Sequence, residues 1–110
     1  MNITTEVIDG VTVLRLSGDL DTGTSGDAQD TIVQMIEDGA SNMLINLKDV
    51  GFVSSAGLRI LLVAAKKMMS IDGQLRVSDL NETVHDVFEI SGFSSILNVF
   101  ATEQDALQDA

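Results

Sequence analysis

Residues 50–62 read VGFVSSAGLRILL, and the change of structure within this stretch decides the fold. An apolar, β-type run that begins at Met43 ends here at two serines, a small residue and a glycine. Leucine-rich sequence of helical character follows at once. The stretch therefore predicts a buried strand, a short turn, and a helix that begins at Ser54 or Ser55.

The hydroxyl groups of Ser54 and Ser55 lie where the first N–H groups of the predicted helix have no partner inside the helix. A serine at this place can cap the helix by accepting a hydrogen bond from one of those groups. It can also carry a phosphate, because the free N–H groups and the positive end of the helix dipole favour a negative charge. The residues alone leave open whether the two serines only cap the helix or also act as a switch.

The remaining sequence continues the alternation of strands and helices. Asp9-Gly10 joins two extended runs and predicts a β-hairpin, and Asp79 with Glu82 resembles a capping box. The apolar patterns predict strands at 3–8, 11–16, 43–47, 74–77 and 96–100. They predict helices over 28–36, from the serine turn to 71, over 79–91 and from 102 onward. This order predicts an α/β fold, a small mixed sheet of about five strands covered by about four helices. The helix that follows the serines is predicted to have an apolar face that comprises Leu58, Leu61, Leu62, Ala65, Met68 and Met69.

Length and composition limit the classes of protein to which the chain can belong. The 110 residues suit a single domain, 1–110, and 17 acidic against 6 basic residues give a net charge of −11. This charge disfavours nucleic acid and anionic membrane surfaces as partners, and it is compatible with a basic protein partner. The absence of cysteine, of a signal sequence and of a long apolar run predicts a cytoplasmic protein without membrane insertion.

The sequence offers little for catalysis. His85 is the only histidine and lies in a helical pattern, apart from any serine that it would have to activate. The glycine-rich stretches are not followed by the Gly-Lys-Ser/Thr of a phosphate-binding loop, and no Gly-x-Ser-x-Gly elbow is present. The nearby carboxylates of Asp19 and Asp21 fit a turn better than an acid–base pair. We therefore expect no enzyme activity, no catalytic residue, no metal site and no cofactor.

Two polar loops are expected to meet at one edge of the sheet. The loop after the second strand holds Asp19, Asp21 and Thr22, and the loop after the third strand holds Ser54 and Ser55. If these strands are parallel neighbours, their carboxyl ends lie together, which is where open α/β sheets bind their ligands. The sequence therefore predicts that the first three side chains lie near the two serines.

Several segments in a fixed order carry a resemblance to a known family. These segments are VLRLSGDLD at 13–21, LINLKDV at 44–50, VSSAGL at 53–58, FEISGF at 88–93 and QDAL at 104–107. Together they resemble a STAS domain, and in particular the stand-alone anti-sigma factor antagonists of bacteria. The resemblance covers nearly the whole chain and implies a STAS-like fold.

The resemblance also implies a partner-switching function. In such proteins the unphosphorylated antagonist binds an anti-sigma factor that is a serine kinase, which frees a sigma factor. The kinase phosphorylates a serine in the signature turn, and a metal-dependent serine phosphatase restores the antagonist. Alignment on Gly57 implies Ser55 as the phosphorylation site, with Ser54 as the alternative. Ser54 stands at a position where many members of the family have Asp. The implied partner-binding residues are Asp19, Asp21, Thr22, Ser54, Ser55, Ala56, Gly57 and Leu58.

Two other functions are open for a STAS domain of this kind. The chain could be an interaction subunit of a lipid-transporting ABC system, with no phosphorylation cycle. It could also sense a nucleotide or another small ligand, although the missing phosphate-binding loop and the negative charge count against this. A homodimer is possible under each of these interpretations.

Overall fold

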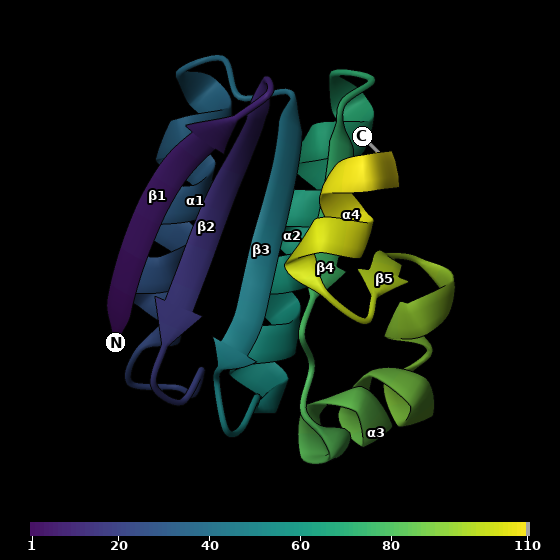
Figure 1. The fold of residues 1–110 in the computed structure, drawn as a ribbon. Coiled ribbons are helices and arrows are strands. Elements are labelled where there is room, and N and C mark those ends of the chain that lie inside the picture. The colour runs from purple at the N-terminus through teal and green to yellow at the C-terminus, as the bar shows by residue number, and fades with distance from the viewer. Residues whose placement is uncertain (110) are drawn as a thin grey trace.

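The computed structural model describes residues 1–109 and shows an α/β domain built on a five-stranded sheet (Figure 1). The strands are β1 (Asn2–Ile8), β2 (Val11–Ser17), β3 (Asn42–Asp49), β4 (Gln74–Ser78) and β5 (Asn98–Phe100). The helices are α1 (Ser25–Glu37), α2 (Ser55–Ser70), α3 (Glu82–Ser91), a 3₁₀ turn (Phe93–Ser95) and α4 (Glu103–Asp109). The predicted fold class is confirmed.

The sheet is mixed, with its strands in the order β1-β2-β3-β4-β5. β1 is antiparallel to β2, and the other neighbouring strands are parallel. The β1–β2 turn contains Asp9 and Gly10 at φ 50° and 83°, the left-handed backbone that the predicted hairpin requires. All parallel strands therefore direct their carboxyl ends to one edge, the lower edge in Figure 1.

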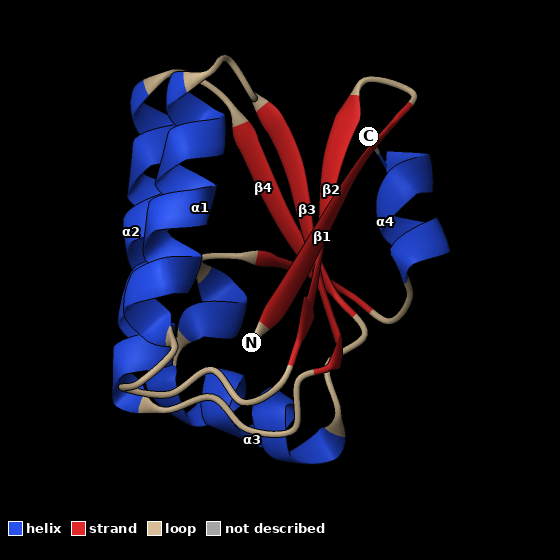
Figure 2. Cartoon of the chain, turned by 90° about the vertical axis from the view of Figure 1, so that its left-hand side faces the viewer, coloured by secondary structure: helices blue, strands red, loops and turns tan. Residues whose placement is uncertain are grey.

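The helices form two layers of unequal size around this sheet. Figure 2 shows α1 and α2 side by side on one face, α4 on the other face, and α3 beyond the edge where the parallel strands end. The side chains of β2 are buried on both faces of the sheet. Leu14 and Leu16 belong to the large core under α1 and α2. Val11 and Val13 belong to a smaller cluster with Ala106 of α4. This two-sided burial is typical of an internal strand with a layer on either face.

Two predicted boundaries were wrong. α3 is capped by Asn81, whose Oδ1 accepts a hydrogen bond from the Val84 N–H at 2.8 Å, and not by Asp79. Asp79 has φ 60°, a left-handed backbone that ends β4 two residues before the cap position. The last strand begins at Asn98 and not near 96, because the 3₁₀ turn occupies the residues before it.

The buried face of α2 differs from the predicted one both within the helix and at its C-terminal end. Ile60 and Ala64 are buried with Leu61 and Met68, whereas the side chain of Met69 is 70% exposed. At about 100° of rotation per residue, Met69 lies one step round the helix from Met68 and faces away from the sheet. None of the helices within residues 1–109 combines the length and hydropathy that a membrane-spanning segment requires.

Candidate functional site

The loops after β2 and β3 are joined directly, as the sequence predicted. Leu20 and Val53 form an isolated parallel β-bridge beyond the two strands. The Leu20 N–H donates to the Phe52 carbonyl at 2.9 Å, and the Ser54 N–H donates to the Leu20 carbonyl at 2.9 Å. This bridge fixes the start of α2 against the loop that leads to α1.

Ser54 is the N-cap of α2. Its backbone is extended, at φ −83° and ψ 176°, and its Oγ accepts a hydrogen bond from the Gly57 N–H at 3.2 Å. Its carbonyl accepts the first helical hydrogen bond, from the Leu58 N–H at 2.9 Å. The N–H, the carbonyl and the hydroxyl of Ser54 are therefore all engaged in holding the turn.

Ser55 is the first residue of α2 and has a different environment. It is exposed, and no hydrogen bond of its hydroxyl is found within residues 1–109. The first turn of the helix contains no acidic side chain that would compete for its free N–H groups. Of the two serines, Ser55 thus presents a free hydroxyl at the positive end of a 16-residue helix.

Removing the Ser54 hydroxyl is expected to cost about 1 kcal/mol of unfolding free energy, the usual value of an N-cap. Ser54→Ala leaves the Gly57 N–H without its side-chain acceptor. Ser55→Ala is the matched control, since it removes a hydroxyl without a partner and adds a good helix former. Urea unfolding of both variants measures the difference, and equal stabilities would contradict the assignment of Ser54 as the cap.

Gly57 is the contact point between α2 and the neighbouring loop. A Cβ built on Gly57 would lie 2.5 Å from the Leu20 carbonyl oxygen, 2.9 Å from the Leu20 Cγ and 3.0 Å from a Val53 methyl group. The helix can begin this close to Leu20 only because the residue has no side chain. Ala56 and Leu58 on either side are half-buried, so the predicted Ser54–Leu58 segment is partly a packing element.

The three predicted residues of the first loop have different positions. Asp21 stabilises the loop itself, because its Oδ1 accepts hydrogen bonds from the N–H groups of Gly23 and Thr24 at 2.9 and 3.1 Å. Asp19 and Thr22 are exposed. The Asp19 carboxylate extends towards the second loop, where a Cβ on Gly51 would be 3.4 Å from its Oδ1. Of the two carboxylates at this edge, Asp21 stabilises the loop and Asp19 faces solvent.

Phe52 is a site residue that the sequence analysis missed. It belongs to the apolar run before the serines, and its sequence context does not distinguish it from the buried residues of that run. In the structure it lies in the loop after β3, where its backbone pairs with Leu20 and its residue is 46% exposed. A large exposed aromatic ring two residues before Ser54 is the kind of side chain that protein interfaces use as an anchor.

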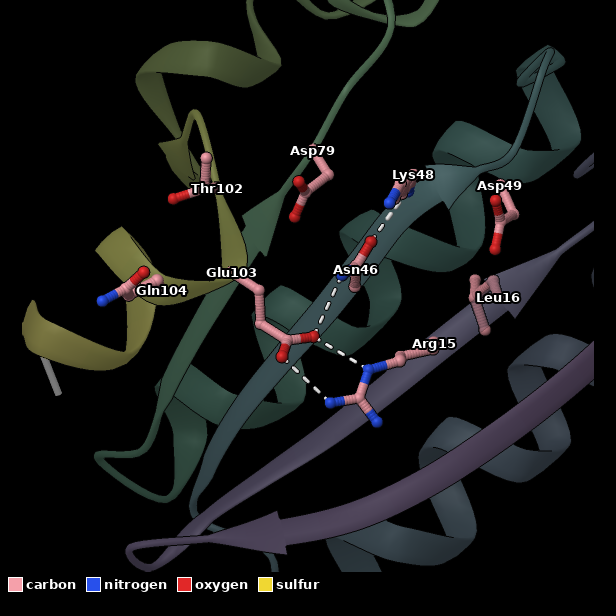
Figure 3. A pocket seen from close by; sticks show the side chains of 9 residues that line it. All are labelled: Arg15, Leu16, Asn46, Lys48, Asp49, Asp79, Thr102, Glu103 and Gln104. Carbon is pink, nitrogen blue, oxygen red and sulfur yellow. Dashed lines mark hydrogen bonds and ion pairs between the residues drawn. The ribbon is translucent and has the colours of Figure 1, made fainter.

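A pocket lies elsewhere, on the α4 side of the sheet (Figure 3). It has a volume of about 500 Å³ and is lined by Arg15, Leu16, Asn46, Lys48, Asp49, Asp79, Thr102, Glu103 and Gln104. Both oxygens of Glu103 accept hydrogen bonds from Arg15 at 2.9 Å, and Oε1 also accepts one from Asn46 at 3.0 Å. These bonds tie α4 to β2 and β3. Within residues 1–109, no cluster of carboxylates and histidine gathers closely enough to hold a metal ion.

The Arg15 guanidinium holds the pKa of Glu103 below its ordinary value of 4.5, and burial of the carboxyl opposes this effect. The same pairing raises the pKa of Arg15, first through Glu103 and then through Glu6. Because the pKa of Glu103 is lower in the folded state, its contribution to stability is complete above about pH 4.5 and is lost as the pH falls through the lowered value.

We expect Glu103→Gln to lower the unfolding free energy by about 1 kcal/mol at pH 7, since the pair is only partly buried. The difference in Tm from the unmodified protein should shrink as the pH falls below 4.5. Glu6→Gln is the control, because Glu6 is more exposed and makes a single contact with Arg15. Thermal unfolding between pH 3 and 7 tests this prediction, since a change of 1 kcal/mol shifts the Tm of a domain of this size by about 4–8 °C. A Tm difference that does not depend on pH would contradict the ionic role of Glu103.

Comparisons with known proteins show the family of the chain. A sequence profile of the STAS domain matches residues 2–106. The chain belongs to the STAS domain family. The matched range includes both loops of the joined edge and all five strands.

The relatives of this STAS domain include anti-sigma factor antagonists. It is 32% identical to the anti-sigma F factor antagonist of Paenibacillus polymyxa, over 91% of this chain and 86% of that protein. It is 31% identical to BtrV of Bordetella bronchiseptica, a candidate anti-sigma factor antagonist, over 96% of this chain and 91% of that one. The crystal structure of an anti-sigma factor antagonist from Mycobacterium paratuberculosis superposes with a TM-score of 0.91 at 26% identity, covering 98% of this chain and 92% of the other.

Proposed function

We propose that this protein is an anti-sigma factor antagonist that binds a serine-kinase anti-sigma factor and is released from it by phosphorylation of Ser55. A serine phosphatase would reverse the modification. The relatives support the general role. The observation that carries the specific proposal is the exposed Ser55 hydroxyl, which has no hydrogen-bond partner within residues 1–109 and stands at the start of α2.

The two serines of the turn differ in their availability to a kinase. The Ser54 hydroxyl accepts the Gly57 N–H, so a phosphate there would replace the N-cap. The Ser55 hydroxyl can be modified without breaking a bond inside the domain. The first N–H groups of α2 then remain to stabilise the added charge. These contrasts favour Ser55 as the acceptor.

The serine at 54, where the family resemblance implies Asp, fits this proposal. Asp and Ser are both good N-cap residues, because each offers a side-chain oxygen to the N–H groups of the first turn. Ser54 takes that role in this chain. The exchange therefore keeps the geometry of the turn and the exposure of the next residue, and it removes one negative charge beside the acceptor.

The partner-binding surface would comprise the exposed residues around this turn. Asp19 and Thr22 supply the loop side, Ser55 supplies the start of α2, and Phe52 adds an exposed aromatic ring between them. Asp21 supports the loop from within. A phosphate on Ser55 brings about −1.5 to −2 charges into the centre of this surface without unfolding it.

The test is a kinase assay with the two serines exchanged separately. We expect the cognate anti-sigma factor kinase and ATP to add one phosphate to the unmodified chain and to Ser54→Ala, and none to Ser55→Ala. Intact-mass and phosphopeptide mass spectrometry report the stoichiometry and the position. Full labelling of Ser55→Ala would transfer the assignment to another residue, and labelling lost only in Ser54→Ala would make Ser54 the acceptor.

A further inference from the structure

The outer face of α2 carries a stripe of side chains, most of them exposed, that begins at Ser55, the proposed phosphorylation site. It consists of Ser55, Arg59, Leu62, Lys66 and Met69, which follow one another at steps of four, three, four and three residues. This spacing keeps side chains on one face of an α-helix, and the stripe is about 21 Å long. Leu62 is half-buried and the other four are exposed, Met69 to 70%. We call these five residues the α2 stripe.

The α2 stripe is positive on a strongly negative molecule. α2 contains Arg59, Lys66 and Lys67 and no acidic residue, although the chain as a whole has a net charge of −11. The other three α-helices contain no lysine or arginine and nine acidic residues: Asp27, Asp30, Glu37, Glu82, Asp86, Glu89, Glu103, Asp105 and Asp109. A tenth acidic residue, Asp38, caps the C-terminus of α1.

The cations of the α2 stripe are available to a partner. Among residues 1–109, the ion pairs use Arg15, Arg76 and His85, and none uses Arg59 or Lys66. Arg76 is also buried, with 3% of its side chain exposed. The stripe thus offers two unpaired cations that alternate with two apolar side chains, the combination found in helix faces that dock on another protein.

We propose that the α2 stripe docks on an acidic surface of the anti-sigma factor. This inference rests on the proposed function and adds the chemistry of the partner to it. Arg59 and Lys66 would face carboxylates, and Leu62 and Met69 would fill apolar positions between them. The stripe extends the interface from Ser55 along the helix, in continuity with the turn that the kinase must reach.

The sign of the partner surface follows from the direction of the switch. A basic surface facing Ser55 would attract a phosphoserine, so phosphorylation would strengthen binding. An acidic surface repels the phosphate, so phosphorylation weakens binding. A phosphate on Ser55 also lies one helical turn from Arg59, with the anion on the N-terminal side, the favourable order for an ion pair within a helix. The phosphate would then pair with Arg59, which would no longer be available to the carboxylates of the partner.

The net charge of the chain does not oppose this docking. Charges that are exposed interact over about 8 Å at physiological ionic strength. Within that range of the α2 stripe, the helix itself contributes only cations. The overall charge still governs long-range encounter, and a partner that is basic elsewhere remains compatible with an acidic contact at α2.

Charge reversal on α2 tests the proposal against a matched reversal on another face. Arg59→Glu and Lys66→Glu change the stripe, whereas Lys48→Glu changes an exposed lysine at the pocket on the α4 side of the sheet. We expect each stripe variant to raise the Kd for the purified anti-sigma factor at least about tenfold, as reversed contact charges do, and Lys48→Glu to change it less than about threefold. Calorimetry gives the Kd, and circular dichroism confirms that all three variants fold.

A charge-swap in the partner completes the test. Glu→Lys or Asp→Lys changes on the acidic surface of the anti-sigma factor should restore binding to Arg59→Glu and weaken binding to the unmodified chain. Equal Kd values for Arg59→Glu, Lys66→Glu and Lys48→Glu would overturn the stripe and leave the proposed function standing. Tighter binding by the stripe variants would show a basic partner surface and overturn it as well. If the unmodified chain fails to bind any anti-sigma factor kinase of its source, the proposed function falls and the inference falls with it.

Discussion

Gly57→Ala is expected to destabilise the domain by about 1–2 kcal/mol, although alanine normally strengthens a helix. The added Cβ would lie 2.5 Å from the Leu20 carbonyl oxygen, a backbone atom that already accepts the Ser54 N–H. The helix would have to move away from Leu20 and strain the bridge between Leu20 and Val53. Overpacking of this kind costs about 1–3 kcal/mol and outweighs the gain of up to about 1 kcal/mol from helix propensity.

Gly26→Ala is the matched control for Gly57→Ala. Gly26 lies in the first turn of α1, and a Cβ built on it meets nothing within 4 Å. This variant should be as stable as the unmodified protein or more stable by a few tenths of a kcal/mol. Urea unfolding of both variants gives the comparison. A Gly57→Ala protein as stable as Gly26→Ala would contradict the close approach of α2 to Leu20.

A phosphate on Ser55 is expected to weaken binding of the anti-sigma factor by at least about a hundredfold, or about 2.7 kcal/mol. It adds about −1.5 to −2 charges at neutral pH, and like charges brought together at an interface cost several kcal/mol. The Ser55 side chain is exposed and Ser54 keeps the cap, so the fold should not change. Amide chemical shifts measured by NMR should therefore move around residues 19–24 and 52–60 and stay constant in α4.

Ser55→Asp should weaken the same binding by a smaller factor, because a carboxylate has one charge and fewer acceptor oxygens than a phosphate. Ser55→Ala should bind as the unmodified chain does. The Tm of each variant provides the control for folding. A loss of binding that followed the loss of Tm would indicate local unfolding and not charge at the interface.

The fold was predictable from sequence because local and long-range signals agree. The Asp-Gly pair requires left-handed backbone in a tight turn, and the structure has it at both residues. The run from Val11 to Leu16 is apolar on both faces, which suits only an internal strand with a layer on either side. Parallel strands must end at the same edge, so the meeting of Leu20 with Val53 followed from the topology.

The details of the site were less predictable, because they depend on packing between distant segments. Either serine can cap a helix, and only the position of the Gly57 N–H relative to Ser54 decides which one does. Phe52 is apolar and follows a buried strand, so its residue type does not reveal that it is 46% exposed in the loop that pairs with Leu20. The boundary at Asn81 depends on the left-handed conformation of Asp79, which the sequence of that segment does not signal.

The most direct measurement of the central claim is the Kd between the anti-sigma factor and this chain with phosphoserine at position 55, before and after treatment with a serine phosphatase. Phosphoserine installed at the single position removes any dependence on the kinase. We predict that the phosphorylated chain binds at least about a hundredfold more weakly than the unmodified chain, and that phosphatase treatment restores the original Kd. Equal Kd values for the phosphorylated and unmodified chains would contradict the assignment of Ser55 as the switch.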